Sequence, residues 1–136
     1  METNQKLVYL AEDDMLMVRM YERLFRLSGF ELEMALNGEE AVSKLQTLKQ
    51  KPAIILLDIM MPKLDGFEVL KFLKENAQFK DVPVVVLTNL AGKDAAARAL
   101  EMGAALYLIK SEYQPKEVVE KIKEVIASHA PGPAAP

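Results

Sequence analysis

Apolar residues gather in five short runs along the chain, and a stretch with helical periodicity follows each run. The runs cover residues 7–11, 31–36, 54–57, 84–87 and 105–109. Four of them are continuously apolar, which is typical of strands that are covered on both faces. The second run alternates polar with apolar residues and predicts an edge strand with one wetter face. Strands and helices that alternate five times predict an α/β fold with a parallel sheet and helices on both of its faces.

The segments between the runs carry helical patterns. One apolar stripe in the first segment consists of Leu16, Met20, Leu24 and Leu27. Ser28-Gly29 predicts the end of that helix. Further helices are predicted over about 39–49, 66–76 and 92–102. The last helix opens with Pro115, and its inner face carries Val118, Val119, Ile122, Val125 and Ile126.

Length and composition narrow the class of protein. The chain has 136 residues, of which 51% are hydrophobic and 27% charged, which suits one domain with a buried core. We expect that domain to span residues 1–130, and residues 131–136 to form a flexible tail or the stub of a linker. The net charge of -3 offers no basic field for nucleic acid. The absence of cysteine excludes disulfides and thiolate metal sites.

The sequence does not predict a membrane protein. Residues 1–6 are polar and lack the apolar stretch of a signal peptide. The apolar runs are far shorter than the roughly 18 residues that a membrane helix needs. We therefore expect a cytoplasmic domain with no membrane partner and no direct binding to nucleic acid.

Polar and charged residues follow four of the five runs. Glu12-Asp13-Asp14 follows the first run, Asp58 the third, Thr88-Asn89 the fourth and Lys110 the fifth. In an open parallel sheet the C-terminal ends of all strands lie at one edge, which is where ligands bind. Carboxylates, a hydroxyl and one ammonium are therefore expected together at that edge.

The carboxylates indicate a metal site. If the first and third strands are neighbours, Asp13, Asp14 and Asp58 lie within several ångströms of one another, and their like charges need a cation or protons nearby. A hard divalent ion meets that need, and Mg²⁺ suits a shallow site that keeps several waters. A second interpretation of Asp14 stays open, because it also stands in the position of a cap for the first helix.

Together with the metal site, Lys110 and Thr88 indicate that the site binds a phosphoryl group. A metal ion, an ammonium and a hydroxyl together satisfy the oxygens of a phosphoryl group. Asp58, which follows an apolar strand, is the expected nucleophile. Simpler roles stay open: a plain salt bridge between Lys110 and Asp58, and a strand or capping role for Thr88.

In order and spacing, these residues match a known family. Over about residues 6–128 the chain resembles a bacterial response-regulator receiver domain. The matching positions are Asp13-Asp14, residues 56–62 around Asp58, Asp65-Gly66, Thr88, Tyr107 and Lys110. The resemblance implies a doubly wound, flavodoxin-like or CheY-like α/β fold, with five helices and five parallel strands in the order 2-1-3-4-5.

The resemblance also implies the phosphoacceptor of a two-component or phosphorelay system. Asp58 would receive a phosphoryl group from a phosphohistidine on a sensor histidine kinase or a phosphotransfer protein. Mg²⁺ would be bound by Asp14, Asp58 and the backbone carbonyl of Met60, with Asp13 acting through water. Such a domain is a signalling module rather than an enzyme, since it catalyses only its own phosphorylation and dephosphorylation.

Members of this family switch between two conformations. The resemblance implies that Thr88 and Lys110 are drawn toward the aspartyl phosphate, and that Tyr107 rotates into the space that Thr88 leaves. The surface of the fourth helix, the fifth strand and the fifth helix then binds a downstream protein, which the sequence does not identify.

Several residues depart from the family pattern. Ser111 stands where many members have proline, so a cis peptide bond after Lys110 is not supported. Asn89 replaces a smaller residue and is expected to narrow access for the donor. Ala105-Leu106 replaces a pair of acids, which removes charges that one large subfamily uses to dimerise.

Two apolar residues bear on the lifetime of the phosphorylated form. Met60 and Leu90 stand two residues after Asp58 and Thr88, at positions that flank the path of attacking water in this family. Their bulky side chains lead to the hypothesis that hydrolysis is slow and that the phosphorylated state is long-lived.

Two other functions stay open at this point. A haloacid-dehalogenase-like, Mg²⁺-dependent phosphohydrolase also uses an aspartyl nucleophile, but it needs a second aspartate two residues later, where this chain has Met60. The other alternative is a receiver-like adaptor that acts without phosphorylation. Asn89 and Ser111 favour it, whereas the acids, Thr88 and Lys110 favour an active receiver.

Overall fold

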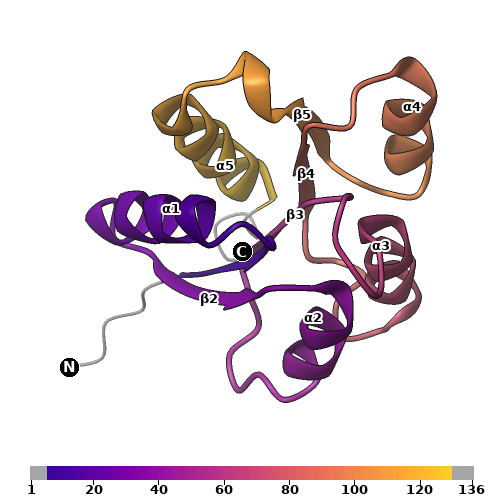
Figure 1. Cartoon of the computed structure of the whole chain (residues 1–136). Helices are drawn as coiled ribbons and strands as arrows, with labels where there is room; N and C mark the ends of the chain where they lie inside the picture. The colour runs from indigo at the N-terminus through magenta and orange to yellow at the C-terminus, as the bar shows by residue number, and fades with distance from the viewer. Residues whose placement is uncertain (1–5, 130–136) are drawn as a thin grey trace.

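The computed structural model describes residues 6–129 and has a five-stranded parallel sheet at its centre (Figure 1). The strands are β1 (Leu7–Ala11), β2 (Glu31–Ala35), β3 (Ile54–Leu57), β4 (Val84–Thr88) and β5 (Leu106–Ile109). They pair in parallel in the order β2-β1-β3-β4-β5, which confirms the predicted fold. β2 lies at one edge and combines buried with exposed residues, as its alternating sequence predicts.

Within residues 6–129, five α-helices cover both faces of the sheet (Figure 1). α1 (Met15–Leu27) and α5 (Pro115–His129) lie on one face. α2 (Gly38–Leu45), α3 (Gly66–Glu75) and α4 (Lys93–Glu101) lie on the other. A short 3₁₀ helix, Lys110–Glu112, joins β5 to the loop before α5.

The parallel register aligns the C-terminal ends of the strands at one edge. Ala11 of β1 pairs with Ala35 of β2 and with Leu57 of β3. Thr88 of β4 pairs with Ile109 of β5. Residues that directly follow these strands therefore emerge side by side, at the edge where the sequence predicts the acids, the threonine and the lysine.

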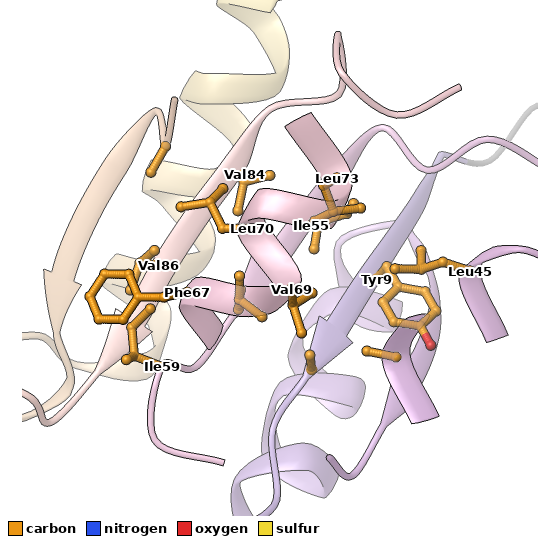
Figure 2. Close-up of a cluster of buried hydrophobic side chains, with 14 of the residues drawn as sticks. Tyr9, Leu45, Ile55, Ile59, Phe67, Val69, Leu70, Leu73, Val84 and Val86 are labelled. Carbon is orange, nitrogen blue, oxygen red and sulfur yellow. The ribbon is translucent and has the colours of Figure 1, made fainter. Parts of the chain in front are cut away.

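Two apolar clusters join the layers, one on each face of the sheet. Figure 2 shows part of the first cluster, in which Tyr9, Ile55 and Val84 of the sheet lie with Leu70 and Leu73 of α3. The second cluster joins the alternate side chains of the same strands to α1 and α5, and it contains every predicted inner-face residue of α5. Burial on both faces explains why β1, β3 and β4 are continuously apolar.

The apolar stripe predicted on α1 packs against the core only through its two middle residues, Met20 and Leu24, which are half-buried. The fully buried residues of the helix are Val18, Tyr21 and Phe25. Leu16 and Leu27, at the two ends of the predicted stripe, are 80% and 77% exposed. Both sets have helical spacing, so periodicity alone does not tell which one faces the core.

The ends of the helices confirm one boundary signal and correct another. Gly29 follows α1 with a φ of 89°, the left-handed conformation that glycine adopts without strain. α2 ends at Leu45, several residues before the predicted end at Lys49, and turns follow it. These differences leave the order of the elements unchanged.

Two expectations concern the chain as a whole. The predicted end of the domain at residue 130 and the tail at residues 131–136 lie outside the described residues. Among the helices of residues 6–129, none has both the length and the apolar character that crossing a membrane requires.

Tyr9 gives a first testable prediction. Its side chain is fully buried, and its hydroxyl is the one buried side-chain polar atom in residues 6–129 without a hydrogen-bond partner. Burial, with smaller contributions from Glu40 and Glu33, raises the pKa of this hydroxyl. Because an unsatisfied buried hydroxyl is costly, Tyr9→Phe is expected to raise the free energy of unfolding in urea by about 1 kcal/mol. A decrease would contradict this prediction and indicate a bound water as the partner.

Candidate functional site

The C-terminal edge of the sheet gathers polar side chains from four strands. Glu12 and Asp13 follow β1, and Asp58 follows β3. Thr88 is the last residue of β4, and Lys110 begins the 3₁₀ helix after β5. Glu12, Asp58 and Thr88 are the buried polar residues of the described chain, with 2%, 4% and 0% of their surface exposed. The structure therefore brings together the predicted residues from β3, β4 and β5.

Lys110 links two of the acids. Its Nζ atom lies 2.6 Å from Oε1 of Glu12 and 2.9 Å from Oδ2 of Asp58. The backbone N–H of Met60 donates to Oδ1 of Asp58 at 3.0 Å, and that of Asp14 donates to Oε2 of Glu12 at 3.1 Å. Each oxygen of the two carboxylates therefore has a hydrogen-bond or ion-pair partner. The predicted salt bridge between Lys110 and Asp58 is present.

Glu12, Asp13 and Asp58 form a cluster of acids. One carboxylate oxygen from each lies within 4.8 Å of the others. Three carboxylates beside the single ammonium of Lys110 leave negative charge in excess, which a cation relieves. Carboxylate oxygens are the donors that Mg²⁺ prefers, and the exposed side chain of Asp13 leaves room for the waters that this ion keeps. The donor set therefore fits Mg²⁺.

Asp14 does not belong to this cluster. Its carboxylate accepts hydrogen bonds from the backbone N–H groups of Leu16 at 2.9 Å and Met17 at 3.4 Å. Asp14 therefore caps the N-terminus of α1, which is the alternative role that the sequence left open. The prediction counts Asp14 among the metal ligands, whereas the structure places its Oδ1 atom at the start of α1 and outside the acid cluster.

The site prediction leaves out Glu12. Two signals in the sequence point to this residue when they are taken together. Glu12 directly follows the last residue of β1, and Asp14 directly precedes α1, where a short acidic side chain commonly serves as a cap. Taken together, these signals predict that the pair of acids at the site is Glu12 and Asp13 rather than Asp13 and Asp14.

Burial and ion pairing act in opposite directions on the charged groups. Burial raises the pKa of Glu12, although hydrogen bonds from Lys110 and from the N–H of Asp14 lower it in part. Burial lowers the pKa of Lys110, but its hydrogen bonds to Glu12 and Asp58 outweigh this effect and leave its pKa above the ordinary value. Lys110 therefore keeps its positive charge at neutral pH, next to Asp58.

The two predicted switch residues meet at the loop after β4. Oγ1 of Thr88 accepts a hydrogen bond from the N–H of Leu90 at 3.1 Å. The hydroxyl of Tyr107, which is half-buried, donates to the carbonyl of Leu90 at 2.7 Å. Burial, with a contribution from Asp58, raises the pKa of Tyr107. Thr88 and Tyr107 are thus connected through a single residue of the loop.

A hollow beside Lys110 opens next to the site. It has a volume of about 320 Å³ and is lined by Met17, Met20, Tyr21, Asn89, Lys110, Ser111, Tyr113 and Pro115. Asn89 and Ser111, two of the departures from the family pattern, line this hollow together with Lys110. The peptide bond between Lys110 and Ser111 is trans. The side chain of Met60, whose carbonyl is a predicted ligand, is 57% exposed.

Comparison with known proteins identifies the family. The model of the response regulator receiver domain matches residues 8–123, and the chain belongs to this family. A probable transcriptional regulator ycf27 from Cyanophora paradoxa is 33% identical over 126 residues, which cover 93% of this chain and 50% of the relative. The chain thus spans about half the length of the curated relatives that it matches.

Solved structures agree with this assignment. The chain is similar to the phosphorylated cyanobacterial phytochrome response regulator RcpA, with a TM-score of 0.83 and 29% identity, over 93% of this chain and 97% of that one. It is also similar to the Mn²⁺-bound form of response regulator Rcp1, with a TM-score of 0.77 and 30% identity, over 96% and 99%. The chain is a receiver domain of the two-component class, a signalling domain rather than a classical enzyme. This membership decides against the haloacid-dehalogenase-like alternative.

Proposed function

We propose that Asp58 accepts a phosphoryl group from a phosphohistidine on a sensor histidine kinase or a phosphotransfer protein. The placement of Asp58 carries this proposal. Its carboxylate is 4% exposed at the end of β3, and one of its oxygens lies 2.9 Å from the ammonium of Lys110. A nucleophile for phosphoryl transfer needs a fixed position and a neighbouring positive charge for the incoming oxygens, and Asp58 has both. The similar response regulator RcpA has a phosphorylated form, which supports phosphorylation of this domain.

In the proposed step, a carboxylate oxygen of Asp58 attacks phosphorus while the P–N bond to the donor imidazole breaks. The donor ring already carries a proton on its other nitrogen, so the imidazole keeps the electron pair of the broken bond and leaves as a neutral ring. The new P–O bond gives an aspartyl phosphate. Since the P–N bond is already activated, the domain mainly has to position the reactants and neutralise negative charge on the phosphoryl oxygens. We assign these tasks to Lys110 and to the hydroxyl of Thr88.

The proposal assigns Mg²⁺ to the acids beside Asp58. Asp13 belongs to the acid cluster and its side chain is exposed, which leaves room for the waters that Mg²⁺ keeps, so Asp13 is the direct ligand that we assign from β1. Asp58 and the backbone carbonyl of Met60 complete the protein's ligands. When bound, Mg²⁺ neutralises negative charge on the transferring phosphoryl oxygens. The similar response regulator Rcp1 has a Mn²⁺-bound form, which supports binding of a divalent cation by this domain.

Phosphorylation is proposed to act through the loop after β4. A phosphoryl group on Asp58 attracts the hydroxyl of Thr88, which now accepts from the N–H of Leu90. Loss of that bond moves the loop whose carbonyl holds Tyr107. The surface of α4, β5 and α5 then changes for a downstream protein, because the two conformations make different contacts with the phosphoryl group.

The limits and the location of the domain are also proposals. The family match over residues 8–123 supports a receiver unit within the proposed limits of residues 1–130. Membership of the two-component class supports a cytoplasmic location and a histidine kinase or phosphotransfer partner. The net charge of -3 supports a domain that does not itself bind nucleic acid.

Thermal melting with a phosphoryl mimic tests the proposed function. Beryllofluoride with Mg²⁺, at 100 times its dissociation constant, is expected to stabilise the chain by about 2.7 kcal/mol, or about 10 °C in Tm. Asp58→Asn is expected to abolish the shift. A wild-type chain that does not respond would contradict the proposal and favour an adaptor that acts without phosphorylation.

A second experiment tests the hypothesis of a long-lived phosphorylated state. Met60 is largely exposed, and Leu90 lies half-buried in the loop after Thr88. Replacing both by glutamine is expected to shorten the half-life of the aspartyl phosphate several-fold, because polar side chains help to position the attacking water. Phosphate release after removal of the donor measures this half-life. Leu27→Gln, an equally polar change at the exposed end of α1, serves as the control, and an unchanged half-life in the double variant contradicts the hypothesis.

A further inference from the structure

α4 is weakly anchored in comparison with its neighbours. Gly92, with a φ of 128°, precedes it, and no side chain caps its first N–H groups. Of its nine residues, Ala99 is the buried one, and an alanine contributes little apolar area. Since short helices depend on tertiary packing for their stability, single contacts carry weight in positioning α4.

One such contact joins α4 to α3. The guanidinium of Arg98 lies over the ring of Phe67, with its central carbon 3.9 Å from the ring centroid. Phe67 is 7% exposed, so its ring is fixed within the core while one face remains open to the cation. A guanidinium over an aromatic face is attractive because the face carries partial negative charge.

Phe67 is in turn fixed to the backbone that carries Asp58. Gly66, the residue before it, donates its N–H to the carbonyl of Ile59 at 2.9 Å. A Cβ atom on Gly66 would lie 2.4 Å from the carbonyl oxygen of Asp58 and 2.5 Å from Cα of Ile59, so the start of α3 packs directly on this backbone. Figure 2 shows the Phe67 ring beside Ile59 and Val86.

We infer that the stack of Arg98 on Phe67 is a clamp that couples the position of α4 to the backbone at Asp58 and Ile59, independently of Thr88 and Tyr107. The inference rests on the proposed function, because the coupling concerns a phosphoryl group on Asp58. The clamp occurs together with an intact ion pair between Lys110 and Asp58, so we assign it to the conformation with the free carboxylate. A contact that belongs to one conformation opposes the other by its own free energy.

The size of the effect follows from the exposure of Arg98. Stacks of this kind at exposed sites contribute about 0.5–1 kcal/mol, which equals about a two- to fivefold change in an equilibrium constant. Arg98→Gln removes the charge and is expected to speed amide exchange of residues 93–101 by about two- to fivefold. It is also expected to lower the beryllofluoride concentration for half-saturation, with Mg²⁺ present, by about the same factor.

Matched variants separate the clamp from a general effect of charge. Lys93→Gln removes the same charge from the first turn of the same helix, where no ring is stacked and a cation opposes the helix dipole, so it is not expected to speed exchange or to change the affinity for beryllofluoride. Phe67→Leu keeps an apolar side chain in the core but removes the ring face, and it is expected to accelerate exchange in α4 as Arg98→Gln does. Arg98→Lys keeps a cation and is expected to fall between wild type and Arg98→Gln.

The outcomes are distinct. If amide exchange in α4 is as slow in Arg98→Gln as in Lys93→Gln, the proposal of a clamp is overturned. Faster exchange with unchanged affinity for beryllofluoride overturns the coupling to Asp58. Exchange is measured without any ligand, so a wild-type chain that fails to bind beryllofluoride contradicts the proposed function separately from the clamp.

Discussion

Asp13→Asn is expected to weaken Mg²⁺-dependent phosphorylation at least about tenfold, whereas Asp14→Asn one residue later is expected to leave it unchanged. Asp13 belongs to the acid cluster with Glu12 and Asp58, so loss of its charge removes a proposed ligand. Asp14 instead accepts from the N–H groups at the start of α1, a role that asparagine performs equally well. The Mg²⁺ concentration that gives half the maximal rate with a small phosphodonor, such as acetyl phosphate, is the measurement.

The pair of variants is its own control, because both remove one negative charge from neighbouring positions. Urea denaturation should show that both variants remain folded. The assignment is contradicted if Asp14→Asn raises the Mg²⁺ requirement as much as Asp13→Asn does. It is also contradicted if neither variant changes the requirement.

Lys110→Met is expected to lower the free energy of unfolding by about 3–5 kcal/mol. The side chains of Lys110, Glu12 and Asp58 are 13%, 3% and 4% exposed, so the loss leaves two buried carboxylates without their shared cation. Removing one partner from a buried ion pair costs much more than the pair itself contributes. Mg²⁺ is expected to restore part of the lost stability, because it compensates the same charges. Urea denaturation with and without Mg²⁺ measures both effects.

Lys123→Met is the matched control for this substitution. Lys123 pairs with Glu120 on α5 at 3.2 Å, but the two side chains are 43% and 67% exposed. Such surface pairs contribute less than about 1 kcal/mol, so the control should change stability little. Equal effects of the two substitutions would contradict a special role for Lys110, as would a loss of stability that Mg²⁺ does not reduce.

The sequence predicts the fold of this chain well because burial on both faces leaves an unambiguous signal. The runs at residues 54–57 and 84–87 are apolar throughout, and the structure buries both completely. α1 is harder to predict. Val18, Tyr21 and Phe25 face the sheet, yet the predicted stripe, whose last residue Leu27 is exposed, has the same helical spacing. Only the contact with the sheet selects between them.

The candidate site shows a similar division. The places of Asp58, Thr88 and Lys110 follow from the rule that parallel strands end at one edge. The roles of Glu12 and Asp14 depend on where β1 ends and α1 begins, and a shift of one residue exchanges a ligand for a cap. The contact between Phe67 and Arg98 joins residues far apart in the sequence, and no local pattern reports it.

The most direct test of the central claim is the intact mass of the chain after incubation with acetyl phosphate and Mg²⁺, followed by peptide mapping. We predict the added mass of one phosphoryl group, located on Asp58 and absent from Asp58→Asn. A chain that gains no mass, or that carries the group on another residue, would contradict the account.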